Sequence, residues 1–124
     1  MISGWALPAL LLTAAAPAPA AVEAWMAFPT DGGGFVAEID TASVTADGAH
    51  RSFRMRLNRA GAAETMLFGM TADCQSKVSV ITRSEVYRDG ALVTGGPIPT
   101  DKQVPRAMNG DPSAEQILDY VCAR

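Results

Sequence analysis

Alternation of apolar and polar side chains is the feature that most constrains this fold, and it dominates the chain after residue 24. Successive side chains of a strand point to opposite faces of a sheet, so alternation predicts strands with one buried face. The pattern is clearest where Phe53, Met55 and Leu57 alternate with polar residues. Turn residues separate the alternating segments, which together predict about six strands in an antiparallel meander. The predicted strands are residues 25–28, 35–40, 52–57, 64–73, 77–87 and 91–93.

Two further details concern the last strands of this predicted sheet. In the segment 77–87, alternation places four side chains on one face: Val78, Val80, Thr82 and Val86. The dipeptide Asp89-Gly90 predicts a type I′ hairpin turn, because both central residues of that turn need positive φ. The segment 95–109 contains several prolines and is expected to be an irregular connection.

The end of the chain has the period of a helix. Apolar side chains recur at i, i+3, i+4, i+7 and i+8 from Ala114 to Cys122, which predicts one buried helical face. Asp111 is expected to cap this helix, with Pro112 at the first helical position, where its missing N–H costs nothing. The predicted fold class is therefore α+β, a single antiparallel β-meander with one C-terminal helix packed on the sheet.

The start of the chain predicts a cleaved signal peptide. Residues 5–16 form an apolar run that suits a signal-peptide core but is shorter than the roughly 20 residues of a spanning helix. An Ala-Pro-Ala sequence ends at Ala20 and fits signal peptidase, so cleavage is expected between Ala20 and Ala21. We interpret residues 1–20 as the signal peptide and 21–124 as one exported domain with no membrane span after cleavage. The alternative is an uncleaved membrane anchor.

The cysteine content agrees with export. The chain has two cysteines, Cys74 and Cys122, and an even number in an oxidising compartment predicts a disulfide. Closing a loop of about 49 residues corresponds to roughly 4 kcal/mol of stabilisation in the chain-entropy model. The bridge would join the end of the 64–73 strand to the buried face of the helix. Two buried free thiols are the alternative.

Charge and motif content weigh against several classes of function. A net charge of -3 is too mild to indicate a nucleic-acid partner. His50 is the only histidine and is expected to be exposed beside a turn, and Asp40 is expected to bind the turn that ends at Ser43. No spacing brings two carboxylates together, so we expect no enzyme and no catalytic residue. The chain also offers too few zinc ligands, and we expect neither a metal site nor a cofactor.

Two groups of side chains are candidates for binding. Arg54, Arg56 and Arg83 point away from the apolar faces and form a candidate contact surface for an acidic partner or glycan. The alternative for these arginines is a solvated face with ordinary charge pairs. Three methionines lie on apolar faces: Met55, Met66 and Met70. Core packing explains their pattern, although thioethers are also soft ligands for Cu(I).

Several short motifs occur in a characteristic order. They are Trp25 near the mature start, Asp40-Thr41-Ala42-Ser43 after the second strand, Asp73-Cys74 at a central strand end, Tyr87-Arg88-Asp89-Gly90 at the hairpin, and Pro112-Ser113 leading to Cys122. In this order, over about residues 25–123, the chain resembles the surface-adhesin protein E family of small bacterial secreted or surface proteins. The resemblance implies a twisted antiparallel sheet with a disulfide-linked C-terminal helix, and adhesion to host or matrix proteins.

The sequence thus predicts a non-enzymatic exported binding or structural module whose partner is an extracellular or envelope protein. No cysteine near the predicted cleavage site could carry a lipid anchor, which favours a periplasmic or freely secreted protein. Trp25 is expected to anchor the core, and recognition is expected at strand edges, the Gly32–Gly34 turn or the 97–105 connection. The alternative function is a periplasmic small-molecule or metal-binding protein with a methionine-lined interior.

Overall fold

The computed structural model describes residues 23–28, 30, 34–59 and 61–124. The predicted signal peptide, its cleavage site at Ala20 and Ala21, and most of the Gly32–Gly34 turn lie outside these described residues. Eight strands form one sheet in the described part. They are β1 (Trp25–Phe28), β2 (Phe35–Asp40), β3 (Thr45–Asp47), β4 (His50–Arg59), β5 (Glu64–Asp73), β6 (Val78–Arg88), β7 (Ala91–Pro97) and β8 (Arg106–Ala107).

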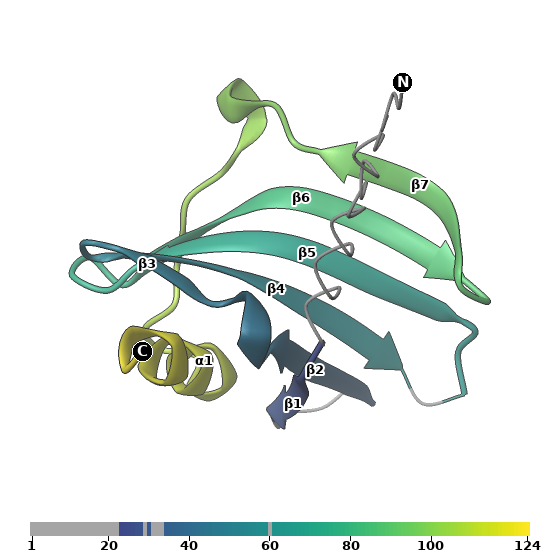
Figure 1. Ribbon diagram of the computed structural model, residues 1–124, viewed down its shortest axis with the longest axis horizontal. Coiled ribbons are helices and arrows are strands. Elements are labelled where there is room, and N and C mark those ends of the chain that lie inside the picture. Colours follow the sequence, from purple (N-terminus) through teal and green to yellow (C-terminus); the bar gives the residue numbers. More distant parts are fainter. Residues whose placement is uncertain (1–22, 29, 31–33, 60) are drawn as a thin grey trace, which may run out of the picture.

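The six longer strands follow the predicted meander. Their order across the sheet is β1-β2-β4-β5-β6-β7, and every pairing is antiparallel. In Figure 1 the strands β4, β5 and β6 run side by side across the molecule. The predicted number of strands was too low, because β3 pairs with β4 and β8 pairs with β6. These two strands have 3 and 2 residues, too few to show a period in the sequence.

The hairpin between β6 and β7 has the predicted turn. Asp89 and Gly90 have φ values of 50° and 80°, the pair of positive angles that a type I′ turn requires. The assignment of faces in β6 was wrong, because the register shifts at Thr82, between the pairs Gly69–Arg83 and Met70–Ile81. Such a bulge moves later side chains to the opposite face. Val86 therefore shares the face of Met66, whereas Val78 and Val80 lie on the other face.

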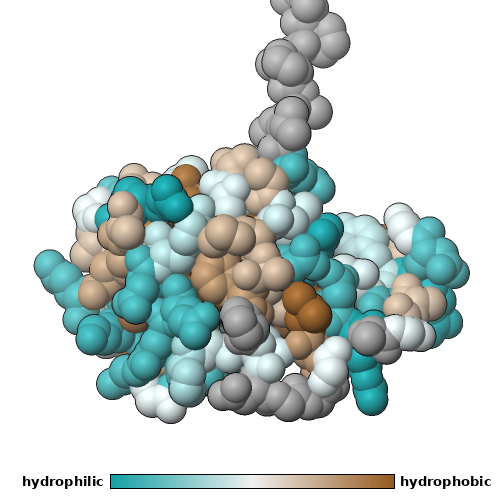
Figure 2. Space-filling model, turned by 90° about the horizontal axis from the view of Figure 1, so that it is seen from below, coloured by the Kyte–Doolittle hydropathy of each residue, from teal (hydrophilic) through white to brown (hydrophobic). Residues whose placement is uncertain are grey.

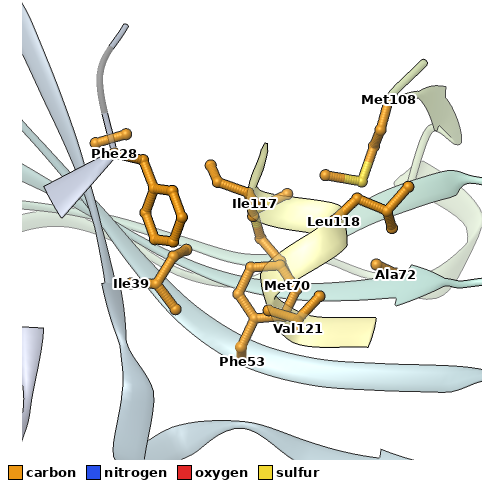
Figure 3. Close-up of a cluster of buried hydrophobic side chains, with 10 residues drawn as sticks. Phe28, Ile39, Phe53, Met70, Ala72, Met108, Ile117, Leu118 and Val121 are labelled. Carbon is orange, nitrogen blue, oxygen red and sulfur yellow. The ribbon is translucent and has the colours of Figure 1, made fainter. Parts of the chain in front are cut away.

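The helix α1 (Pro112–Cys122) forms as predicted and is capped by Asp111, whose Oδ1 accepts from the Ser113 backbone N at 3.0 Å. Ile117, Leu118 and Val121 are the buried residues of α1. They pack on Phe53, Met70 and other side chains of one sheet face, as Figure 3 shows. We call this the core face.

The predicted disulfide is confirmed. Cys74 and Cys122 are bonded, with their Cα atoms 5.8 Å apart. Cys74 follows β5 directly and its backbone N donates to the Ala49 carbonyl at 2.8 Å, so one end of the bridge is fixed to the sheet. Arg51 holds the other end, because its Nε donates to the Val121 carbonyl at 3.2 Å.

The helix covers only part of the core face. A helix of 11 residues is about 16 Å long, whereas a strand of 10 residues spans about 33 Å. The bridge fixes α1 near the Asp73 end of β5, and in Figure 1 α1 lies below the left-hand part of the sheet. Apolar side chains toward the Glu64 end of β5, Met66 among them, therefore lie beyond the helix.

Removing the disulfide should destabilise the fold without changing its topology. We expect the double variant Cys74→Ser/Cys122→Ser to lose about 4 kcal/mol of unfolding free energy, because an unfolded chain without the loop gains entropy. Urea unfolding followed by circular dichroism measures the loss. Wild-type protein unfolded with reductant is the matched control and should lose the same amount. A loss below about 1 kcal/mol would mean that packing alone holds α1 in place.

Candidate functional site

A groove of about 580 Å³ lies on the face of the sheet opposite α1, which we call the open face. Its lining includes Trp25 of β1, Arg54 and Arg56 of β4, Leu67 of β5 and Tyr87 of β6. The strand register places Arg56 directly opposite Leu67. Directly opposed side chains share one face of an antiparallel pair, so these residues form one continuous surface.

Trp25 belongs to this open-face groove, and its predicted role as a core anchor was wrong. Trp25 and Phe28 are three residues apart on β1, so their side chains lie on opposite faces of the sheet. Phe28 is opposite Ala37 on the core face, and Trp25 is opposite Asp40 on the open face. The Arg56 guanidinium carbon lies 4.2 Å from the Trp25 ring centroid, within the range of a cation–π contact. The indole Nε1 donates to Glu23 Oε2 at 3.1 Å. The ring is thus held in place by a polar neighbour at its edge and a cation on its face.

The three arginines of the predicted contact surface lie on the open face, and each meets a carboxylate. Arg56 Nη2 lies 2.9 Å from Glu38 Oε2, and this hydrogen-bonded pair holds the pKa of Glu38 below its usual range. Arg83 Nε lies 2.7 Å from Glu85 Oε1. Arg54 is held more loosely, with Nη1 3.4 Å from a Glu23 oxygen. The surface therefore alternates in charge, as the charge-pair alternative predicted, and presents both donors and acceptors.

Among the carboxylates that lie near the three arginines, Glu85 is more buried than all but Asp40, whose Oδ2 lies 3.6 Å from Arg54 Nη1. We call Arg83, Glu85 and Tyr87 the Glu85 network. A hydrogen bond from Arg83 lowers the pKa of Glu85, and Tyr87 donates to its Oε2 at 3.0 Å, which raises the pKa of Tyr87. The backbone of β7 lies close to β6 at Glu85, because the residue opposite Glu85 is Gly95. A Cβ at Gly95 would lie 2.1 Å from the Ser84 carbonyl oxygen, so only glycine fits there.

The other polar residues singled out from the sequence have local roles. Asp40 accepts from the Ala42 backbone N at 3.1 Å and Ser43 Oγ donates to the Asp40 carbonyl at 2.7 Å, so the predicted turn is confirmed. His50 is exposed, as predicted, and its Nε2 lies 3.5 Å from Asp73 Oδ2. Backbone N–H groups of Ser76 and Gln75 lower the pKa of Asp73. Asp73 thereby shapes the turn from β5 to β6.

A second hollow, of about 460 Å³, lies on the core face beside α1, and we call it the Met-lined cleft. Its walls include Met55, Leu57, Met70 and Ile81 from the sheet, Met108 from the connection before α1, and Ile117 from the helix. Of the three methionines considered in the sequence, two therefore line one cleft. Met66 instead lines a smaller neighbouring hollow of about 220 Å³.

Apolar side chains also reach the outer surface near this face. Met26 of β1 and Phe35 of β2 are exposed, and Met26 is opposite the core residue Ile39. In Figure 2, which shows the molecule from below, apolar surface lies in the middle and hydrophilic surface on both sides of it. The core of the protein is thus not closed off on this side by a full second layer.

Within residues 23–28, 30, 34–59 and 61–124, no three His, Cys, Asp or Glu side chains gather where they could hold a metal ion. No helix in the same ranges is long and apolar enough to span a membrane. A metal in the Met-lined cleft would therefore depend on thioether sulfurs.

Comparison with family models, curated proteins and solved structures finds no match to this chain. The resemblance to the surface-adhesin protein E family therefore stays a prediction.

Several residues of the open face and of the Met-lined cleft were missed in the sequence. Glu38, Glu85 and Leu67 share the open face only because of the strand register. Alternation in 64–73 and 77–87 could have placed Leu67 beside Glu85, had the bulge at Thr82 been foreseen. Arg106 and Met108 could not have been found, because their position depends on the path of an irregular connection.

The Glu85 network should make stability depend on pH. The pKa of Glu85 is lower in the folded than in the unfolded state, so its contribution is present above about 4.3 and is lost as pH falls through the folded-state value. Between about pH 6 and about pH 3, we expect the urea midpoint of Glu85→Gln to fall less than that of wild type. Asp101→Asn, on an exposed 3-10 turn outside the network, is the control and should behave as wild type. An equal fall in Glu85→Gln and wild type would contradict this role.

Proposed function

We propose that this chain is a non-enzymatic exported binding module that contacts an extracellular or envelope protein through its open face. The observation that carries the proposal is the open-face groove, in which an aromatic ring and paired charges are held on a rigid sheet. Trp, Tyr and Arg are the residues most enriched at energetically important positions of protein interfaces. The groove has all three, in Trp25, Tyr87, Arg54 and Arg56. The likeness to the surface-adhesin protein E family supports the same class of function.

The ion pairs of the groove suit recognition better than stabilisation. Arg54 and Glu23 are both substantially exposed, and exposed pairs add little to stability. Their effect is to fix the side chains before a partner arrives, which lowers the entropy cost of binding. A partner that presents both acidic and basic groups would match the alternating charges.

Export is supported by the disulfide and by the N-terminal sequence. Disulfides persist in oxidising compartments, and the bridge links the only two cysteines of the chain. Residues 1–20 have the pattern of a signal peptide. The proposed location is therefore the periplasm or the outside of the cell.

Partner binding should depend on the groove. We expect Trp25→Ala, and separately Glu38→Gln/Arg56→Gln, to weaken binding to a captured partner by roughly tenfold or more, because each removes a central contact. The domain 21–124 is immobilised, and purified matrix and envelope proteins are passed over it. Glu64→Gln/Arg88→Gln removes an exposed ion pair outside the groove and is the matched control. Equal binding by all variants would place the contact surface elsewhere.

Export should leave a defined N-terminus. Expressed in a bacterial host, the full chain should be recovered outside the cytoplasm with Ala21 as its first residue, as Edman sequencing would show. Ala20→Leu replaces the small residue before the cut and should slow cleavage. Recovery of the uncut chain in the cytoplasm with both thiols free would refute export.

The Met-lined cleft favours a second candidate function, the binding of a small molecule. Ligand sites are commonly concave, largely apolar and about 300–1,000 Å³ in volume, with few polar groups. The cleft fits this description at about 460 Å³. Flexible methionine side chains adapt to different apolar ligands. The two functions use opposite faces of one sheet and are compatible with each other.

A further inference from the structure

We propose that the Met-lined cleft binds an amphipathic carboxylate, a free acid with an apolar chain such as a fatty acid. This proposal rests on the second candidate function above and adds the chemical class of the ligand. Two observations carry it: an apolar trough that α1 leaves uncovered, and an arginine at its rim without an ion pair.

The walls of the trough suit an alkyl chain. Met55, Leu57 and Met70 line the cleft from the sheet, and Ile117 and Met108 line it from α1 and the connection before α1. Figure 3 shows Met108 beside Leu118 of the helix. Unbranched thioether side chains can repack around a flexible chain and keep van der Waals contact along it.

The trough continues beyond the helix. Leu57 also lines the smaller hollow, together with Met66 and Phe35. Met70 and Met66 are four residues apart on β5, which corresponds to about 13 Å along the strand. An elongated apolar body can therefore lie along β5, whereas a compact one would leave part of the apolar face in water.

The rim of the cleft selects the charge of the ligand. Arg106 of β8 is exposed at the rim and, among the described residues, makes no ion pair. Asp111 also lines the cleft, but its carboxylate accepts from the Ser113 backbone N at the start of α1, where negative charge is favoured. Asp111 is thus engaged by the start of the helix, and Arg106 is the charged side chain of the rim that is left to pair with a ligand. A guanidinium binds a carboxylate through two parallel hydrogen bonds, so an acid is favoured over an alcohol or amine.

The test compares three probes of equal chain length: decanoate, decanol and decylamine. We expect decanoate to bind most tightly by isothermal titration calorimetry and to shift the methyl NMR signals of Met55, Met70 and Met108, but not that of Met26. Arg106→Gln should weaken decanoate binding about tenfold and leave decanol unchanged, because only the acid uses the guanidinium. Lys102→Gln, an exposed cation outside the cleft, is the matched control and should bind all probes as wild type.

A second variant tests whether the cleft is the binding site, independently of the class of ligand that it prefers. Leu57 lines both hollows and its side chain is half-buried, so Leu57→Trp should fill the trough and abolish binding of decanoate and decanol, with circular dichroism to confirm that the variant folds. Equal binding of the three probes, or no effect of Arg106→Gln, would overturn the proposed preference for a carboxylate. The second candidate function, binding of a small molecule in this cleft, would still stand. Absence of binding by every probe, or binding unaffected by Leu57→Trp, would overturn both the site and the second candidate function.

Discussion

The structure depends most on the Cys74–Cys122 bridge, which holds α1 against one end of the sheet. The bridge ties the last residue of an 11-residue helix to the end of β5, so the helix lies at one end of the sheet. One end of the core face is thereby sealed by Ile117, Leu118 and Val121. The other end keeps apolar side chains without a second layer, and the Met-lined cleft lies at the boundary. The bridge therefore stabilises the position of α1 that gives both the sealed core and the hollow beside it.

The open face is stabilised by charge pairing and not by a covering layer. It needs no covering layer, because its charges are matched by neighbours, across strands for Arg56 with Glu38 and along β6 for Arg83 with Glu85. Opposite charges on neighbouring strands satisfy each other within the sheet and still leave their outer edges to solvent. An aromatic ring at one side, Trp25, turns this polar surface into a groove. The two faces of one sheet thus offer two different kinds of recognition.

Local patterns made much of the fold predictable. Alternation gave the extents of β1, β2 and β5, the Asp89-Gly90 pair gave the turn, and the cap at Asp111 gave the start of α1. Long-range geometry was harder. One extra residue at Thr82 changed the face of its neighbours, and β8 takes its place from a pairing across the sheet. The position of Trp25 depended on register, since an aromatic residue suits a core and a groove equally well.

α1 leaves the part of the core face around Leu57 and Met66 accessible to small molecules. Relaxation of methyl protons by dissolved oxygen, a small apolar paramagnet, tests it directly in the ligand-free protein. We predict strong relaxation at Met66 and Leu57, intermediate relaxation at Met55, and weak relaxation at Ile39 and Val121, which are fully buried. Uniformly weak relaxation at all of these methyl groups would show that the face is closed and would contradict the account.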